Sequence, residues 1–245
     1  KLDIPGPEDS AGGVITADVD DSGSMDFVVT VPGHVAAYGG DGKKLWVLKT
    51  DVVVGGSSER EGLPGHCGPG VAAGDVDGDG KCEVVFLTKD LGFHIVEGKT
   101  GREKAKAKPA VPKGAQRWEL AMIADFRGTG KDFDILLQAT NKDGYRMGKF
   151  LAAYAMKDLL AGGKPLWQTD KFVSCAHNGA RLADLNGDDR DEVLGVTIFS
   201  PDGKLITRAI PDRYHGDSVF VADVNPKRKG LEVVMLEKGA NQVQV

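Results

Sequence analysis

Short apolar runs of four or five residues, rich in Val, Ile, Leu and Ala, alternate with polar turns along the whole chain. Runs of this length, bounded by Gly or Asp, are typical of β-strands. Five polar segments each lie between two such runs. The runs before them are residues 14–17, 71–74, 121–124, 180–183 and 219–222, and the runs after them are residues 27–31, 84–87, 135–138, 193–196 and 233–236.

The five polar segments are copies of one motif that opens with an acid. The first acids follow one another at intervals of 39 to 59 residues, which indicates an internal structural repeat. The copies are "DVDDSGSMD" from Asp18, "DVDGDGKCE" from Asp75, "DFRGTGKDFD" from Asp125, "DLNGDDRDE" from Asp184 and "DVNPKRKGLE" from Asp223.

Most repeats continue with a third strand, a Gly turn and a fourth strand. Third strands are predicted in "HVAAY" from His34, "FHIVE" from Phe93 and "FLAAY" from Phe150, and fourth strands in "KLWVL" from Lys44 and "PLWQT" from Pro165. Asp-Gly between two such runs is a strong hairpin signal. Four antiparallel strands at this period describe a β-propeller blade. We therefore predict an all-β propeller, one domain over residues 1–245, with blades starting near residues 14, 71, 121, 180 and 219 and a helix only at residues 155–161.

The fifth repeat stops at Val245, inside its predicted third strand. One interpretation is that "KLDI" at residues 1–4 supplies the missing outer strand and closes a five-bladed ring. The other, which we favour, is that this chain is an incomplete part of a larger ring of seven or eight blades.

Composition and charge narrow the class of function. The 34 glycines and 7% aromatic residues suit many tight turns. The mixed charge, with a net of −5, argues against nucleic acid as a partner. No apolar run approaches the roughly 18 residues of a membrane helix, so no membrane span is expected. The absence of an initiator Met and of a signal peptide suggests a mature or truncated product.

The acidic loops have the spacing of oxygen ligands around a hard cation such as Ca²⁺. Loops 1, 2 and 4 (the first, second and fourth copies) carry the predicted ligands, with main-chain carbonyls expected from Lys81 and Arg190. Their ninth-position closure differs from the EF-hand, so flanking helices are not required. The predicted ligands are Asp18, Asp20, Ser22 and Asp26; Asp75, Asp77, Asp79, Lys81 and Glu83; and Asp184, Asn186, Asp188, Arg190 and Glu192.

These loops resemble the calcium loops of FG-GAP repeats, the propeller blades of integrin α-chains and many bacterial surface proteins. The resemblance implies two to three bound Ca²⁺ ions in a mainly structural role. Loops 3 and 5 depart from the motif at Arg127, Thr129, Pro226 and Lys227, and we expect no ion there. Calcium sites suited to millimolar concentrations favour an extracellular or periplasmic location.

Residues just before each inner strand are expected at the end opposite the acidic loops, because a strand of about seven residues spans about 20 Å. In a propeller this places them around the central axis. Three of the five His residues occur here, seven to nine residues ahead of a loop acid. The set is His66 and Cys67; Arg117, Trp118 and Glu119; Cys175, His177 and Asn178; and Tyr214, His215 and Asp217. We predict a pocket formed by these side chains.

The segment "HGDSVFVADVNPKRKGLEVVM" from His215 is similar to a repeated segment of rhamnogalacturonan lyases of polysaccharide lyase family 11. That resemblance implies β-elimination from a uronate, which needs a base, an acid and a cation beside the carboxylate. His215 or His177 would be the base, Tyr214 the acid, and Arg117 or Ca²⁺ the carboxylate partner. His66, Trp118, Glu119, Asn178 and Asp217 would contact the polysaccharide, with Trp118 and Tyr214 stacking on sugar rings.

Three other interpretations remain open. The chain could be a non-enzymatic adhesion or scaffold propeller that binds a glycan or a cell-surface protein. Cys67 and Cys175 could bind Zn or Cu together with the His residues, or could form a disulfide; Cys82, at the other end, is expected to be unpaired. The "DGKKLW" and "GGKPLW" hairpins are also similar to quinoprotein propellers, but we expect Trp46 and Trp167 to pack between blades.

Overall fold

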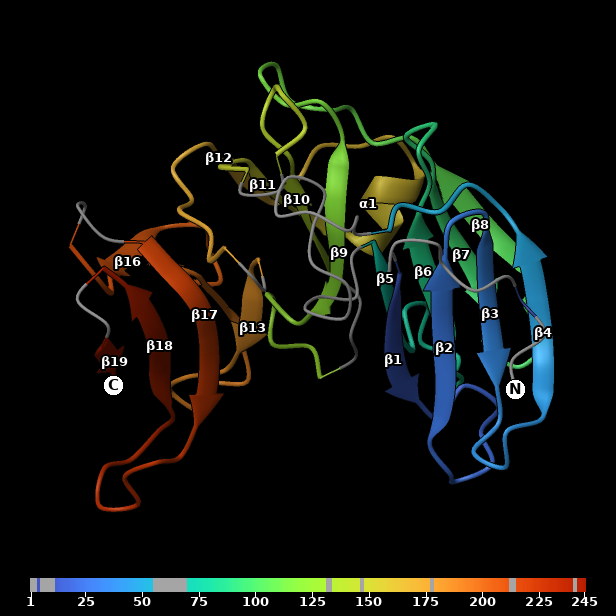
Figure 1. The fold of residues 1–245 in the computed structure, drawn as a ribbon, viewed down its shortest axis with the longest axis horizontal. Coiled ribbons are helices and arrows are strands. Elements are labelled where there is room, and N and C mark those ends of the chain that lie inside the picture. The colour runs from blue at the N-terminus through green and yellow to red at the C-terminus, as the bar shows by residue number, and fades with distance from the viewer. Residues whose placement is uncertain are drawn as a thin grey trace.

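Five antiparallel sheets form an arc of blades in the computed structural model (Figure 1). The structure describes residues 4, 12–54, 70–130, 134–145, 148–176, 179–211, 215–239 and 242–245. Within each sheet the hydrogen-bonded order follows the chain order. The all-β, propeller-type fold predicted from the apolar runs is confirmed.

Each blade begins with an inner strand and ends with an outer one. Blade 1 has β1 (Gly13–Ala17), β2 (Asp26–Val31), β3 (His34–Tyr38) and β4 (Lys44–Lys49); blade 2 has β5 (Val71–Gly74), β6 (Glu83–Leu87), β7 (Phe93–Glu97) and β8 (Glu103–Ala107); blade 3 has β9 (Trp118–Ala124), β10 (Asp134–Ala139), β11 (Leu151–Ala155) and β12 (Trp167–Thr169); blade 4 has β13 (Arg181–Ala183), β14 (Glu192–Leu194), β15 (Thr197–Phe199) and β16 (Leu205–Arg208); blade 5 has β17 (His215–Ala222), β18 (Glu232–Lys238) and β19 (Gln242–Gln244).

The core consists of apolar layers between successive blades. Val28 of blade 1 packs with Val84 of blade 2, and blade 2 packs in turn on blade 3 through one continuous cluster. Further clusters join blade 3 to blade 4 and blade 4 to blade 5. The inner strands lie in chain order, with β1 beside β5, β5 beside β9, and β13 beside β17. Each blade therefore depends on its neighbours for burial of its apolar faces.

Two tryptophans fix neighbouring blades in the same way. Trp46 Nε1 donates a hydrogen bond to Gly98 O at 2.6 Å, and Trp167 Nε1 donates to Pro201 O at 2.7 Å. In both cases the indole of an outer strand reaches the last hairpin turn of the next blade. Gly101 and Gly203 complete the fit, because a Cβ there would lie 2.7 Å and 2.5 Å from the rings. The prediction that these tryptophans pack between blades is confirmed.

The junction between blades 2 and 3 uses a helix instead. Helix α1 (Met156–Leu160) occupies the last turn of blade 3, where residues 155–161 were predicted to be helical. Its Met156 and Leu159 pack in the same cluster as Ala105 of β8. Ala105 follows Gly101 by four residues, as Trp46 follows Gly42. The small side chain makes room for the helix where a tryptophan would collide with it.

The two ends of the arc differ. Ile4 packs on the face of blade 1 that carries Val29 and Tyr38, and the rest of the predicted closing strand lies outside the described residues. At the other end, blade 5 is three-stranded, as the position of Val245 predicted. Its face turned away from blade 4 exposes Phe220, Leu236 and Val243, at 61%, 45% and 65% of their surface.

Candidate functional site

The acidic loops share one internal scaffold. In every loop, one oxygen of the closing acid accepts a hydrogen bond from the main-chain N–H of the second loop residue. In loops 1 to 4 this acid is at most 3% exposed, so the hydrogen bond offsets part of the cost of burying it. The pairs are Val19–Asp26 at 3.0 Å, Val76–Glu83 at 3.1 Å, Phe126–Asp134 at 3.0 Å, Leu185–Glu192 at 2.9 Å and Val224–Glu232 at 3.1 Å.

The opening acid turns the loop back on itself. Asp18, Asp75 and Asp184 each accept a hydrogen bond from the N–H of the sixth loop residue, at 2.7, 2.9 and 2.9 Å. That residue has positive φ, which Gly23 (82°) and Gly80 (81°) adopt without steric cost. The N–H groups of Asp189, Gly187 and Asp188 outweigh the opposing effect of burial, so the pKa of Asp184 is lowered.

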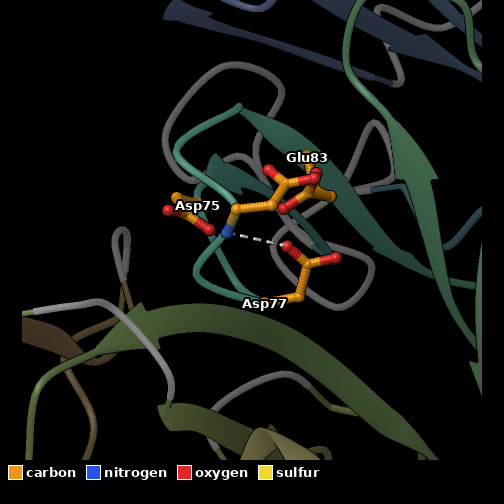
Figure 2. A group of neighbouring side chains, drawn as sticks. Asp75, Asp77 and Glu83 are labelled. Atoms are coloured by element: carbon orange, nitrogen blue, oxygen red, sulfur yellow. Dashed lines mark hydrogen bonds between the residues drawn. The ribbon is translucent and has the colours of Figure 1, made fainter.

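Two loops gather carboxylates at a spacing that suits a cation. In loop 2, oxygens of Asp75, Asp77, Asp79 and Glu83 lie within 4.8 Å of one another, and Figure 2 shows three of these side chains turned toward a common point. Loop 1 gathers Asp18, Asp20 and Asp26 in the same way. Such oxygen sets fit Ca²⁺ better than a soft metal. The predicted ligands of loops 1 and 2 that carry carboxylates are therefore brought together.

A lysine already occupies the acidic cluster of loop 2. Lys104 reaches it from outer strand β8, and its Nζ lies 2.6 Å from Asp77, 2.9 Å from Glu83 and 3.2 Å from Asp79. Burial raises the pKa of Glu83, and Lys104 opposes that shift. Although burial lowers the pKa of Lys104, its bonds to Asp77, Glu83 and Asp79 leave it above the ordinary value. The cluster thus contains an internal cation.

Loop 3 has its own cation built in. Arg127 pairs with the closing acid Asp134 through Nε and Nη2, both at 2.7 Å. Arg127 is the third residue of the loop, where loops 1 and 2 have Asp20 and Asp77, and the absence of an ion from loop 3 stays a prediction. Burial raises the pKa of Asp134, and the charge of Arg127 opposes the shift.

Loop 4 is arranged differently from loops 1 and 2. Glu192 Oε1 accepts a hydrogen bond from Asn186 Nδ2 at 3.2 Å, whereas Asp188 accepts one from the N–H of Arg190 at 3.1 Å, as Asp79 does from Lys81 in loop 2. Among the described residues its acids do not form a cluster of three. The Arg190 side chain instead joins blades, through Phe126 O at 2.7 Å and Asp202 at 2.6 Å. Calcium binding by this loop, and by the carbonyls of Lys81 and Arg190, stays a prediction, as does the role of Ser22, whose N–H donates to Asp18.

The opposite end of the arc, where the inner strands begin, is called here the start face. Arg117 lies there, with Nε and Nη2 at 3.0 and 2.9 Å from Glu119, a side chain that is only 7% exposed. Neighbouring Trp118 is 2% exposed, and its Nε1 donates to Pro109 O at 3.2 Å. A ring so enclosed belongs to the core, and the predicted stacking of Trp118 on a sugar has no support in this geometry.

Blades 4 and 5 meet on the start face. The N–H of Ala176 donates to Gly216 O at 2.9 Å, and a Cβ on Gly216 would lie 3.2 Å from Cys175 Sγ. Cys175 is a buried free thiol, and burial raises its pKa to about 12. Cys175 forms no disulfide here, and its binding to a soft metal stays a prediction. Asp217, partly buried, lies beside it on β17.

The remaining predicted residues of the start face cannot be placed. His66, Cys67, His177, Asn178 and Tyr214 lie outside the described residues, and of His215 only the main chain, paired with Lys238, is described. The predicted imidazole cluster is therefore neither supported nor contradicted.

Two features of the site had little signal in the sequence. Lys104 lies 21 residues beyond Glu83, and only the hairpin register of β7 and β8 brings it back to loop 2. Gln138 is 2% exposed and links blades 3 and 4, donating to Ser174 Oγ and accepting from the N–H of Ala180, both at 3.0 Å. In the sequence alone, a lysine in an outer strand or a glutamine near a strand end gives no indication of such contacts.

Comparison with known proteins supports the lyase resemblance. Two Bacillus subtilis proteins match: rhamnogalacturonan endolyase YesW, 26% identical over 84% of this chain and 38% of its own length, and rhamnogalacturonan exolyase YesX, 27% identical over 69% of this chain and 34% of its own. No family model matches. This chain thus spans little more than a third of the relatives that it matches.

The solved structures agree on the architecture. The crystal structure of YesX superposes with a TM-score of 0.68 at 20% identity, covering 96% of this chain and 47% of that one. The WD40 domain of Toxoplasma gondii coronin gives a TM-score of 0.55 at 13% identity over 94% of this chain and 54% of that one. At these identities the likeness establishes the propeller fold. Among the described residues, no helix is long and apolar enough to cross a membrane.

Proposed function

We propose that this chain is part of a secreted, calcium-binding propeller that binds a rhamnogalacturonan-type polysaccharide and cleaves it by β-elimination. The observation that carries the proposal is the match to rhamnogalacturonan lyases over most of the chain, not just over the segment that follows His215. The acidic clusters of loops 1 and 2 support the calcium assignment. Because the relatives are much longer, further parts of a complete enzyme can lie outside this sequence.

The reaction removes the C5 proton of a uronate, forms a C4–C5 double bond and breaks the C4–O bond, with a proton passing to the leaving oxygen. In this proposal His215 or His177 takes the C5 proton, because an imidazole whose protonated form has a pKa near 6.5 is mostly neutral at neutral pH. Tyr214 protonates the leaving oxygen. Arg117 holds the substrate carboxylate. Its pairing with Glu119 fixes its orientation but leaves part of its charge compensated. The acidic clusters of loops 1 and 2 lie at the opposite end of the blades, so in this proposal their calcium stabilises the propeller and Arg117 is the partner of the substrate carboxylate.

The test follows absorbance of the unsaturated product when the protein is mixed with rhamnogalacturonan and other uronate polymers, with calcium present. Activity is expected with rhamnogalacturonan, with a loss of at least a hundredfold in His215→Asn or His177→Asn, whichever is the base. Lys99→Glu, an exposed change in a turn of blade 2, is the matched control. Absence of product with every polymer, in a protein that binds calcium, contradicts the enzymatic proposal.

The second candidate is an adhesion or scaffold propeller that binds a glycan or cell-surface protein without chemistry. The salt bridge between Arg117 and the buried Glu119 favours it, because a compensated guanidinium is a weak partner for a substrate carboxylate. Calcium-dependent binding of rhamnogalacturonan without any product distinguishes this candidate from the lyase.

A further inference from the structure

A hollow of about 640 Å³ lies on the flank between the outer strands of blades 3 and 4. Its volume is in the range of sites for small molecules, roughly 300–1,000 Å³. Three separate segments form it: the link between blades 2 and 3, both ends of the β11–β12 hairpin, and the β15–β16 turn. Lining residues that bear on its chemistry are Lys113, Phe150, Gln168, Thr169, Lys171 and Leu205.

The walls of this hollow combine apolar surface with hydrogen-bonding groups. Phe150 is partly exposed, and Leu205 exposes 54% of its surface. Gln168, also exposed, adds an amide, and the Thr169 hydroxyl, which accepts the N–H of Lys171 at 3.2 Å, adds a further polar group. An aromatic ring beside amide and hydroxyl groups is suited to a sugar, whose faces are apolar and whose edges carry hydroxyls.

The charge of the hollow favours an anion. Among the ion pairs between described residues, Lys108 pairs with Asp90 and Lys149 with Asp170, and none includes Lys113 or Lys171. The acid that lines the hollow, Asp170, lies 3.7 Å from Lys149, whose ammonium is also 5.3 Å from the Phe150 ring. This excess of positive charge stands out in a chain whose net charge is −5. A carboxylate of a uronate matches it.

The hollow continues toward the start face. A second, shallower hollow is lined by Gly114, Asn141, Lys142 and Asp143. Gly114 joins the two, because it follows Lys113 and a Cβ there would lie 3.4 Å from the Phe150 ring. Beyond them the same turn reaches Arg117, since a Cβ on Gly144 would lie 3.4 Å from Arg117 Nη1. The two hollows therefore adjoin at Lys113 and Gly114, and the turn that lines the second one reaches Arg117; together they are called here the groove.

We propose that this groove is a binding path for an acidic polysaccharide chain, which leads it from the flank of the propeller to the start face. Lys171 and Lys113 hold uronate carboxylates at the outer end, Phe150 contacts a sugar face, and Lys142 contacts the chain further inward. An extended ligand suits the groove better than a compact one, because Lys113 and Lys171 line one hollow and Lys142, beside Asp143, lines the adjoining one. The groove rests on the proposed function for the identity of the sugar, and on its own residues for its preference for an anionic chain.

The test measures binding of saturated uronate oligosaccharides of increasing length, and of their carboxyl-reduced neutral analogues, by calorimetry with EDTA present. Wild type is expected to bind the acidic series, with affinity rising with length, and to bind the neutral series at least tenfold more weakly. Lys113→Glu/Lys171→Glu should weaken binding at least tenfold at every length. Lys142→Glu should weaken binding of long chains selectively. Lys99→Glu/Lys229→Glu, with the same charge change on blades 2 and 5, should bind as wild type does.

Equal binding of acidic and neutral chains, or wild-type affinity in Lys113→Glu/Lys171→Glu, overturns the groove. So does the absence of any binding at millimolar oligosaccharide. The proposed function fails separately: if no unsaturated product forms but lysine-dependent binding of acidic chains persists, the groove stands and the lyase does not. If product forms and the lysine variants bind acidic chains as wild type does, the lyase function stands and the groove does not.

Discussion

Lys104 decides how strongly loop 2 can hold a metal, because its ammonium contacts three of the four acids that would bind the ion. Calcium must displace it. Lys104→Met keeps the unbranched apolar stem of the side chain and removes the competing charge, so calcium affinity at loop 2 should rise about five- to tenfold, or about 1–1.4 kcal/mol. Calorimetric titration of calcium measures this.

Lys106→Met is the matched control, since Lys106 lies two residues further along β8 and pairs with Glu103 at 3.7 Å, away from the loop. Without calcium, Lys104→Met should be less stable than wild type, because three carboxylates lose their cation. Equal calcium affinity in both variants would show that Lys104 does not compete.

The described thiols make a second prediction at this scale. Burial raises the pKa of both Cys82 and Cys175 to about 12, and neighbouring carboxylates, Glu83 first among them, add to the shift at Cys82. At pH 8 their thiolate fraction is then about a thousandfold below that of a free cysteine with pKa of about 8.5. In a Cys67→Ser variant, alkylation by iodoacetamide should be slow until the protein unfolds. Rapid labelling of the folded variant would contradict this environment.

At two junctions between blades, a tryptophan of one blade packs on the last hairpin turn of the next blade, and the glycine of that turn makes the contact possible. Gly101→Ala and Gly203→Ala place a methyl against the indole, at 2.7 and 2.5 Å, in a left-handed conformation with φ of 69° and 74°. Each should lower the free energy of unfolding by about 2–4 kcal/mol, from overpacking and backbone strain together. Urea denaturation measures the loss.

Gly42→Ala is the matched control for these turns. Gly42 has nearly the same φ, 79°, at the equivalent turn of blade 1, but nothing lies within 4 Å of its Cβ position. It should cost only the backbone term, about 1 kcal/mol. Equal losses in all three variants would mean that the indole contact contributes nothing.

Strands, turns and the helix, whose patterns lie within a few neighbouring residues, could be predicted from the sequence. Contacts between residues far apart in the chain could not. The apolar runs, the Asp-Gly turns and the helix at residues 155–161 are encoded within a few residues, and their strands and helix form as expected. The filling of loop 2 by Lys104 depends on strand register between β7 and β8. The burial of Trp118 depends on packing between blades 2 and 3, which its position before a strand does not reveal.

At the scale of the whole molecule, calcium should stabilise the arc. A ligand at a hundred times its dissociation constant adds about 2.7 kcal/mol per site, and about 2–4 °C per kcal/mol is expected for a chain of this length. Removing calcium with EDTA should therefore lower the Tm by about 5–10 °C for each occupied loop. Differential scanning fluorimetry measures the shift.

Asp75→Asn/Asp77→Asn should remove the contribution of loop 2 and shrink this shift, while Asp143→Asn, in a turn on the start face, should leave it unchanged. A Tm that does not respond to calcium in wild type would contradict ion binding in loops 1 and 2. The acidic cluster of loop 2 was predictable because its four ligands lie within nine residues of one another, whereas a site whose residues come from four separate blades has no such local pattern.

The placement of the three tryptophans gives the molecule a set of optical reporters. Trp46, Trp118 and Trp167 are held at the first, second and third junctions between blades, and among the described contacts the fourth junction, around Cys175 and Met235, has none. Tryptophan emission therefore does not report on the unfolding of the last blade. If far-ultraviolet circular dichroism begins to fall at a lower urea concentration than the tryptophan emission maximum begins to shift, the C-terminal sheet unfolds first. Single Trp→Phe replacements then give the order in which the other three junctions between blades unfold.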